Sequence, residues 1–188
     1  MNRRDLLKRS ALAAGGALTV GMVSGFWGCR TEANSGVNWT PEFFTELQGK
    51  NLAEVADRII PRTDTPGAKD VGAHEVIDQI VAHCTEPEQQ GDLQQGLEAL
   101  NAKAQETHGA DFYTLSPAKM DELLTAEAQA AQADDRHWWR GMKYLAMMTY
   151  FTSEAGATEH LQYEPNPGPY QGCLPLADVG NGRAWGLE

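Results

Sequence analysis

Residues 40–61 have the sequence TPEFFTELQGKNLAEVADRIIP, and this stretch decides the fold class. Its apolar residues recur three or four positions apart, which is the spacing of one face of an α-helix. Thr40 suits the N-cap and Pro41 the first helical position, and Gly49 is expected to bend the helix. Pro61 ends it, because the residue before a proline is disfavoured in helical geometry. We therefore predict a helix over residues 41–60, with an apolar face of Phe43, Phe44, Leu47, Leu52, Val55, Ala56, Ile59 and Ile60.

Four further helices are predicted downstream of a turn-rich loop over residues 61–72. An apolar stripe from Ala73 to Cys84 predicts the second helix, with Val76, Ile77, Ile80 and Val81 on it. Thr85 with Glu88 three residues later predicts a capping box for the third, and Gly109 its end. The fourth begins at Ser116-Pro117 and the fifth at Asp134 or Asp135. The expected core residues of these three helices are Leu93, Leu97, Leu100, Ala104, Leu123, Leu124, Ala128, Ala131, Trp138, Trp139, Met142, Leu145, Ala146, Thr149 and Tyr150.

No run of alternating β-branched residues predicts a strand, so the predicted fold class is all-α. We expect a single compact helical domain of about five helices with an extended, proline-rich C-terminal segment. Alternating prolines within residues 163–176 favour a polyproline-like path. The apolar residues of this segment indicate that it packs across its own domain or lies on a partner, and both alternatives are open.

The first 28 residues have the layout of a secretory leader, with a positive start followed by an uncharged, weakly apolar run. Paired arginines followed by two leucines and a lysine predict a twin-arginine signal peptide over residues 1–28, and the signal residues are Arg3, Arg4, Leu6, Leu7 and Lys8. Residues 29–39 are then a linker, and residues 40–188 the helical domain. Two anchors are alternatives: an uncleaved leader, or a lipid on Cys29, although the bulky Phe26 and Trp27 fit lipoprotein processing poorly.

Charge and cysteine content limit the classes of partner. The 188 residues carry a net charge of −11, and residues 1–28 hold four basic residues and one acidic residue, so the remainder carries −14. So acidic a chain is not expected to bind nucleic acid or anionic lipid. Beyond Cys29 only Cys84 and Cys173 are present, and the oxidising envelope would permit them to pair.

Motifs that carry chemistry are not found in the sequence. No Cys-x-x-Cys pair, dinucleotide-binding glycine motif or nucleophile elbow occurs. A helical bundle can bind two irons through Glu-x-x-His pairs, but the nearest motif is Asp134-x-x-His137, which suits a helix start. The five histidines lack metal-ligand spacing. We therefore predict no catalytic, cofactor-binding or metal-binding residue on this chain.

Three blocks of sequence resemble the gluconate 2-dehydrogenase subunit 3 family, the small subunits of exported flavin-dependent sugar and alcohol dehydrogenases. The first is Ala56-Asp57-Arg58-Ile59-Ile60-Pro61 with Thr63-Asp64-Thr65-Pro66-Gly67-Ala68. The second is Tyr150-Phe151-Thr152-Ser153-Glu154-Ala155-Gly156-Ala157-Thr158, and the third runs from Tyr163 to Leu176. The resemblance covers almost the whole chain after the leader.

This resemblance implies a non-catalytic subunit that helps a partner mature and travels with it through the twin-arginine translocase. The partner would be a GMC-type large subunit that carries FAD, with a cytochrome c subunit in some complexes, and the location would be periplasmic. A different class of function is the alternative: a standalone helical envelope lipoprotein that binds a small ligand.

The resemblance also suggests which residues contact the large subunit. We expect them in the 61–72 loop and the proline-rich segment, namely Pro61, Thr63, Asp64, Pro66, Gly67, Tyr163, Pro165, Pro167, Pro169, Tyr170, Leu174 and Pro175. Cys173 has three alternatives: a disulfide with Cys84, a disulfide with a cysteine of the large subunit, or a free thiol.

Overall fold

A computed structural model describes residues 39–163 and the single positions 169, 173, 175 and 183. Its α-helices are α2 (Glu46–Ile59), α3 (Ala73–Cys84), α4 (Pro87–His108), α5 (Pro117–Ala133) and α6 (Trp138–Phe151). A short 3₁₀ helix, η1 (Phe112–Thr114), precedes α5, and a π-helical turn, η2 (Gly156–His160), follows α6. No strand occurs within these described residues, and the prediction of an all-α fold is confirmed.

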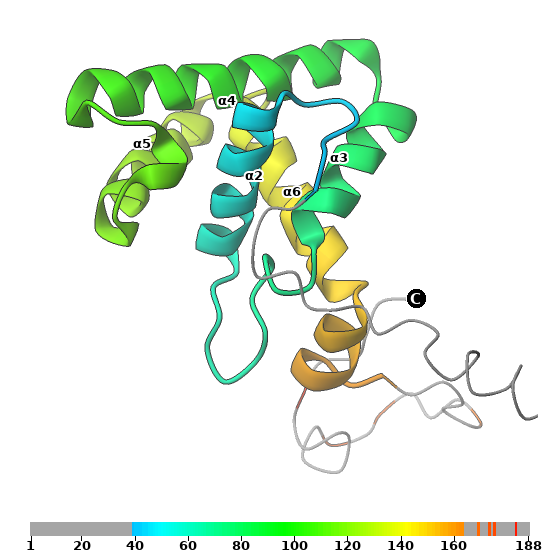
Figure 1. Cartoon of the computed structure of the whole chain (residues 1–188). Helices are drawn as coiled ribbons and strands as arrows, with labels where there is room; N and C mark the ends of the chain where they lie inside the picture. The colour runs from blue at the N-terminus through cyan, green and yellow to red at the C-terminus, as the bar shows by residue number, and fades with distance from the viewer. Residues whose placement is uncertain (1–38, 164–168, 170–172, 174, 176–182, 184–188) are drawn as a thin grey trace, which may run out of the picture. The chain divides into compact units, whose positions relative to one another are not determined.

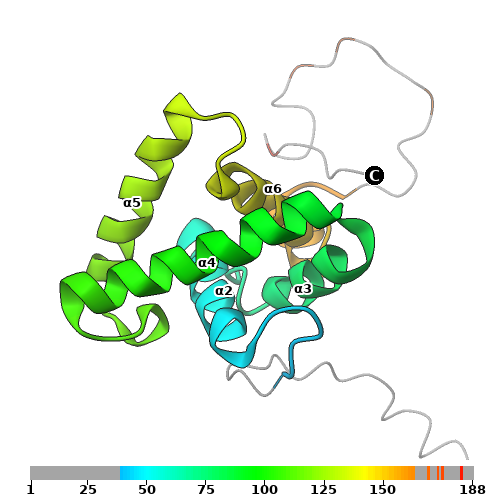
Figure 2. The ribbon, with the colours of Figure 1, turned by 90° about the horizontal axis from the view of Figure 1, so that it is seen from above.

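The helices form two crossing layers. Helices α2, α3 and α6 pack on one another, and α4 crosses α2 and α6 at one end of this group (Figures 1 and 2). Helix α5 packs against α6 and α2. Burial of the apolar stripes against one another stabilises this arrangement, by about 25 cal/mol for each Å² of apolar surface removed from water. The buried cluster includes Leu52, Val55, Ile77, Val81, Leu93, Leu97, Leu100, Leu123, Leu124, Trp139, Met142 and Ala146.

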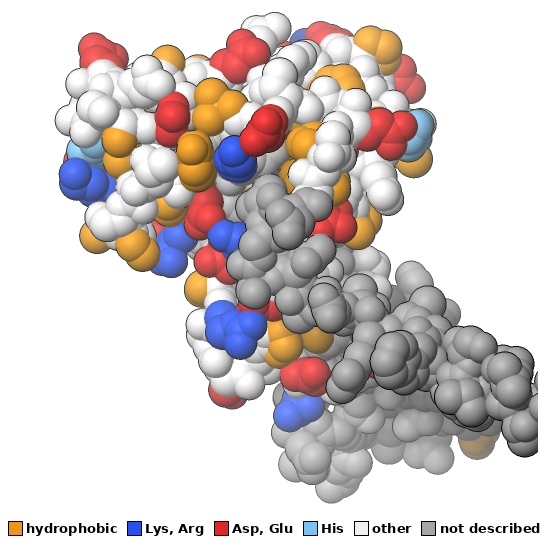
Figure 3. All heavy atoms as spheres, in the orientation of Figure 1, with side chains coloured by type: hydrophobic (Ala, Val, Ile, Leu, Met, Phe, Trp, Pro, Cys, Tyr) orange, Lys and Arg blue, Asp and Glu red, His pale blue; other side chains and the backbone are white. Residues whose placement is uncertain are grey.

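Most of the predicted core residues are buried, but three predictions of burial are wrong. Leu47 on α2, and Val76 and Cys84 on α3, are exposed, because each lies on part of a helix that no other described element covers. Acidic side chains are spread over the visible face of the helical body, with small groups of hydrophobic side chains between them (Figure 3).

The start of α2 differs from the prediction. The helix begins at Glu46, with Thr45 as N-cap in a capping box with Gln48, and not at Pro41. The reason is a buried carboxylate on α3: Asp78 accepts backbone N–H bonds from Glu42 (2.6 Å), Phe43 (3.2 Å) and Phe44 (3.0 Å). These three N–H groups are therefore satisfied outside a helix, which removes the need for helical geometry at residues 42–44.

Gly49 does not end or interrupt α2, although the sequence suggested a bend there. A Cβ at this position would lie 2.6 Å from Pro41 Cγ and 3.0 Å from Trp39 Cζ3. The glycine therefore lets the segment before α2 fold back onto the helix.

Two predicted helix starts are also wrong. The first turn of α4 has Glu86 at the N-cap without a capping box, because the Thr85 hydroxyl donates to Ile80 O (3.1 Å) and Glu88 pairs with Arg136. Helix α6 has His137 at its N-cap in place of an aspartate, and His137 Nδ1 accepts from Trp139 N at 3.3 Å. The predicted end of α4 is confirmed, since Gly109 has a left-handed backbone (φ 69°).

Candidate interaction site

The loop between α2 and α3 is held by its own backbone. Ala68 N donates to Ile60 O (2.8 Å) and Ala73 N donates to Ala68 O (3.0 Å). A Cβ on Gly67 would lie 2.7 Å from Arg62 N, so a close crossing of two chain segments requires glycine here. Figure 1 shows that this loop extends beyond the end of α2.

An ion pair closes the same loop across its base. Arg62 Nε donates to Asp70 Oδ2 at 2.7 Å, and Arg62 Nη2 donates to the other carboxylate oxygen. Gly67 N also donates to Asp70 (2.8 Å). The Arg62 guanidinium lowers the pKa of Asp70, so the carboxylate is charged at neutral pH and the two-point pair is maintained.

A hydrogen bond from Tyr150 connects the loop to α6. The side chain of Tyr150 is fully buried and its hydroxyl donates to Pro66 O at 2.8 Å. Ala56, Ala68 and Ala73 surround it in a second, smaller apolar cluster. Gly156 packs on the backbone of the same tyrosine, since an added Cβ would lie 2.0 Å from Tyr150 O. The first two sequence blocks, 84 residues apart at this bond, are therefore joined in space.

The predicted contact residues of the loop differ in how far they are exposed to solvent. Pro61 is exposed at the start of the loop, Thr63 and Asp64 are exposed at its tip, Pro66 is half-buried, and Gly67 is buried. Gly67 therefore shapes the loop and does not present a surface. At the tip, the Thr63 hydroxyl donates to Asp64 Oδ1 (3.0 Å) and lowers the pKa of Asp64.

The C-terminal predictions are only partly within the described residues. Tyr163, Pro169 and Pro175 are exposed. Cys84 and Cys173 are exposed free thiols, so the structure does not contain a disulfide between them, and pairing stays a prediction. Outside the described residues lie the signal residues Arg3, Arg4, Leu6, Leu7 and Lys8, linker residues 29–38 with Cys29 among them, and Pro165, Pro167, Tyr170 and Leu174.

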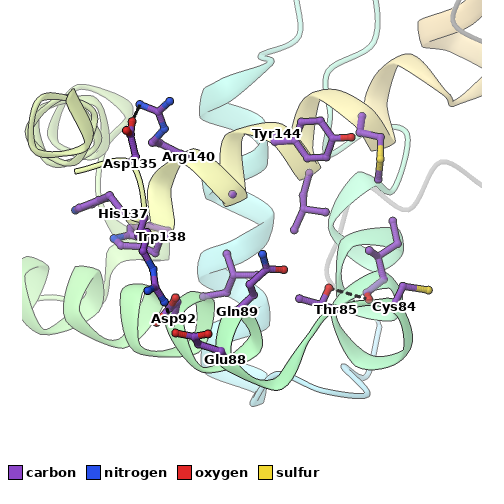
Figure 4. A pocket seen from close by; sticks show the side chains of 16 residues that line it. Cys84, Thr85, Glu88, Gln89, Asp92, Asp135, His137, Trp138, Arg140 and Tyr144 are labelled. Atoms are coloured by element: carbon purple, nitrogen blue, oxygen red, sulfur yellow. Dashed lines mark hydrogen bonds and ion pairs between the residues drawn. The ribbon is translucent and has the colours of Figure 1, made fainter. Parts of the chain in front are cut away.

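The sequence did not indicate a pocket of about 700 Å³ between the end of α3, the start of α4 and the outer side of α6. Cys84, Thr85 and Tyr144 lie toward one end, and Asp135, His137 and Arg140 toward the other (Figure 4). Its apolar lining consists of Ile80, Leu93, Trp138, Leu145 and Met148.

Charged residues at the rim of this pocket pair mainly with one another. Arg136 pairs with Glu88, which raises the pKa of the guanidinium, and Arg140 Nη1 lies 3.2 Å from Asp135 Oδ1. Trp138 Nε1 donates to Glu127 at 3.0 Å and links α6 to α5. No cluster of His, Cys, Asp and Glu suited to a metal ion occurs in the part of the chain that the structure describes.

A second hollow of about 460 Å³ lies between α5 and α6. Tyr144 and Arg140 line both hollows, so Tyr144 forms a ridge between them. The side chain of Tyr144 is 62% exposed, and that of Met147 next to it is 38% exposed. The signal that could have found this surface is the composition of α6, which contains no acidic residue in an acidic chain.

The fold and the site define a small all-α domain with a braced surface loop and hollows along one helix. Residues 46–168 match the family model described as Gluconate 2-dehydrogenase subunit 3, and the chain belongs to this family. The family name describes one subunit of a dehydrogenase complex. No curated protein and no solved structure matches the chain. Among the described helices, none has the length and apolar character needed to cross a membrane.

Proposed function

We propose that this chain is the non-catalytic small subunit of an envelope FAD-dependent dehydrogenase of the gluconate, sugar or alcohol type. It acts as the maturation partner of a GMC-type flavoprotein subunit and carries that subunit through the twin-arginine translocase to the periplasm. Membership of the subunit 3 family supports the assignment to a complex. The Arg3-Arg4 leader supports export of folded cargo.

The observation that carries the proposal is the braced loop between α2 and α3. Tyr150, Asp70 and Gly67 hold the loop in place, while Pro61 at its start and Thr63 and Asp64 at its tip remain exposed. A loop that is ordered before binding loses little conformational entropy when a partner covers it. A surface of this kind suits a stable contact with another subunit.

Catalysis is placed on the partner. FAD would be bound by the large subunit, and a cytochrome c subunit would receive electrons in complexes that contain one. The small subunit contributes by mass action: a partner that binds only the folded flavoprotein stabilises it by about 2.7 kcal/mol when its free concentration is 100 times the Kd. Folded flavoprotein is also the form that the twin-arginine route accepts.

The test is isolation of the full chain, tagged at its C-terminus, from the envelope of the native host without reductant. A yellow, flavin-containing complex with a larger chain is the expected product. Changing Arg3 and Arg4 to Lys should leave the flavoprotein in the cytoplasm. A colourless, monodisperse single chain, isolated while the flavoprotein is being expressed, would overturn the proposal.

A loop-tip variant makes the test specific to the site. Thr63→Arg should reduce the amount of flavin that copurifies, because it adds a large charged side chain where the partner is expected to lie. Thr114→Arg is the matched control, since Thr114 is also exposed but belongs to η1. Equal flavin recovery with both variants would contradict the role of the loop.

The alternative function, a standalone envelope lipoprotein that binds a small ligand, has one observation in its favour. The pocket of about 700 Å³ beside α6 has the volume of a small-molecule site. A monodisperse chain that copurifies with a small organic molecule and no second protein would favour this alternative.

A further inference from the structure

Helix α6 differs in charge from the rest of the described domain. Residues 39–163 contain 9 Lys and Arg against 21 Asp and Glu, yet the 14 residues of α6 contain Arg140 and Lys143 and no acidic residue. Each of the other α-helices within these residues carries at least two carboxylates. The outer side of α6 is therefore a locally basic strip along the smaller hollow, whose lining includes Arg140 and Lys143 and no carboxylate, whereas Glu88, Asp92 and Asp135 line the larger hollow.

This strip also exposes apolar side chains. Tyr144 and Met147 protrude from it, with a hollow on each side of Tyr144. Exposed Tyr and Met beside apolar hollows have the composition of a protein interface.

Gly141 is a second, independent indication. It lies within α6 and lines the larger hollow, where an added Cβ would meet only Leu93 Cδ2, at 3.8 Å. Its backbone conformation is not one that requires glycine. Glycine within a helix is less favourable than alanine. Packing therefore does not require glycine at this position. We infer that the small size of Gly141 keeps the larger hollow open.

We propose that Tyr144, Met147 and the hollows on both sides of Tyr144 form a second docking surface, which binds an acidic segment with a central apolar side chain on the partner subunit. This proposal rests on the proposed function, which supplies the partner. The apolar side chain would enter the hollow over Gly141, and a flanking carboxylate would face Lys143, since Arg140 already pairs with Asp135. The surface is separate in sequence from the exposed loop residues 61–64.

The positive charge of the α6 surface makes a second copy of this chain an unfavourable binding partner for it. A two-fold interface brings the same patch of both copies together. Lys143, which has no ion-pair partner within the described residues, would then lie near a second Lys143, and like charges in a desolvated contact disfavour association. A different chain with carboxylates at matching positions avoids this repulsion.

The experiment measures the Kd of the full small subunit for its flavoprotein, with the wild-type complex as reference. Gly141→Leu fills the larger hollow with an uncharged side chain and should raise the Kd at least about 10-fold. Gly91→Leu, at a helical glycine outside the hollow, should change the Kd less than about 2-fold. Met147→Glu should weaken binding, whereas Leu47→Glu, at a site of nearly equal exposure on α2, should not.

Two further measurements separate loss of docking from loss of folding. The far-UV circular dichroism of each variant should equal that of the wild-type chain, and its melting temperature should be no lower than that of the wild-type chain, since replacing a helical glycine favours the helix. A photoreactive phenylalanine derivative at position 144 should crosslink to the flavoprotein, while the same group at position 47 should not. Lys143→Glu should also slow association at low salt more than Lys119→Glu does.

The outcomes distinguish this inference from the proposed function. If the wild-type chain binds the flavoprotein but Gly141→Leu and Met147→Glu bind it equally well, the proposed docking surface on α6 is refuted. The proposed role as a subunit of the complex is then unaffected. If the wild-type chain binds no flavoprotein, both proposals fall. Crosslinking from position 144 to a second copy of this chain would contradict the choice of occupant.

Discussion

Acidification from pH 7 to pH 5 should destabilise the helical domain through a single buried histidine, His74. Its side chain is 3% exposed, its Nδ1 has no hydrogen-bond partner within the described residues, and its ring meets the edge of Trp39 with centroids 5.2 Å apart. Burial, with a smaller contribution from the charge of Lys69, lowers the pKa of His74 from 6.5 to about 4. The nearest carboxylate oxygen, on Glu75, is 3.9 Å away.

The sign and size of the effect follow from this lowered pKa. Below pH 6.5 the unfolded chain binds a proton at His74 that the folded chain does not, so the stability present above pH 6.5 is lost as the pH falls toward 4. With pKa values of 6.5 unfolded and about 4 folded, the loss is about 2 kcal/mol at pH 5 and about 3 kcal/mol at pH 4.

The assay is urea unfolding of the purified full chain at pH 7 and pH 5, repeated with His74→Phe, which keeps an aromatic ring beside Trp39 but cannot titrate. The difference in unfolding free energy between the two pH values should be smaller in His74→Phe by about 2 kcal/mol. His83→Gln, at an exposed histidine, serves as the control and should behave like the wild-type chain. If His74→Phe has the same pH dependence as the wild-type chain, the reasoning is refuted.

Three other predictions concern contacts that join separate segments. Asp78→Ala should lower the unfolding free energy by about 3 kcal/mol in urea titrations, because it leaves the N–H groups of residues 42–44 without their acceptor, and an unchanged midpoint would contradict this. Tyr150→Phe should lower it by about 1 kcal/mol and increase hydrogen exchange in the 61–72 loop, because the bond to Pro66 O is lost; unchanged exchange would argue against the brace. Gly96→Ala should lower the unfolding free energy by about 1–3 kcal/mol, and with it the melting temperature, because the added Cβ would lie 2.2 Å from Trp138 Cγ. Gly91→Ala, where a Cβ has room, should not lower the melting temperature.

The helical segments could be predicted from the sequence because periodicity is a local property. The apolar stripes of α4 and α5 predicted their buried residues, and Pro61 and Gly109 predicted two helix ends. Helix starts were harder, since capping depends on which acceptor reaches each N–H group. Thr40, Thr85 and Asp134 had suitable side chains, yet Thr45, Glu86 and His137 occupy the N-caps.

The candidate site was predicted only in part. The 61–72 loop was expected from its turn residues, but its brace depends on Tyr150, which lies 84 residues from its acceptor. The α6 surface was missed because the sequence placed Trp138 and Leu145 in the core without indicating which side of the helix stays open. Tyr144 and Met147 are exposed because the packing of α3, α4 and α5 leaves that side of α6 uncovered.

The sequence by itself therefore determined the all-α class, the five main helical segments and the resemblance to the subunit 3 family, because these depend on residue spacing along the chain. Tertiary structure alone decided that Asp78 caps residues 42–44, that Tyr150 holds Pro66 and that Tyr144 stands between two hollows. Each of these depends on side chains from different helices, and their distances are set by how the helices cross, which the spacing of apolar residues within one helix does not specify.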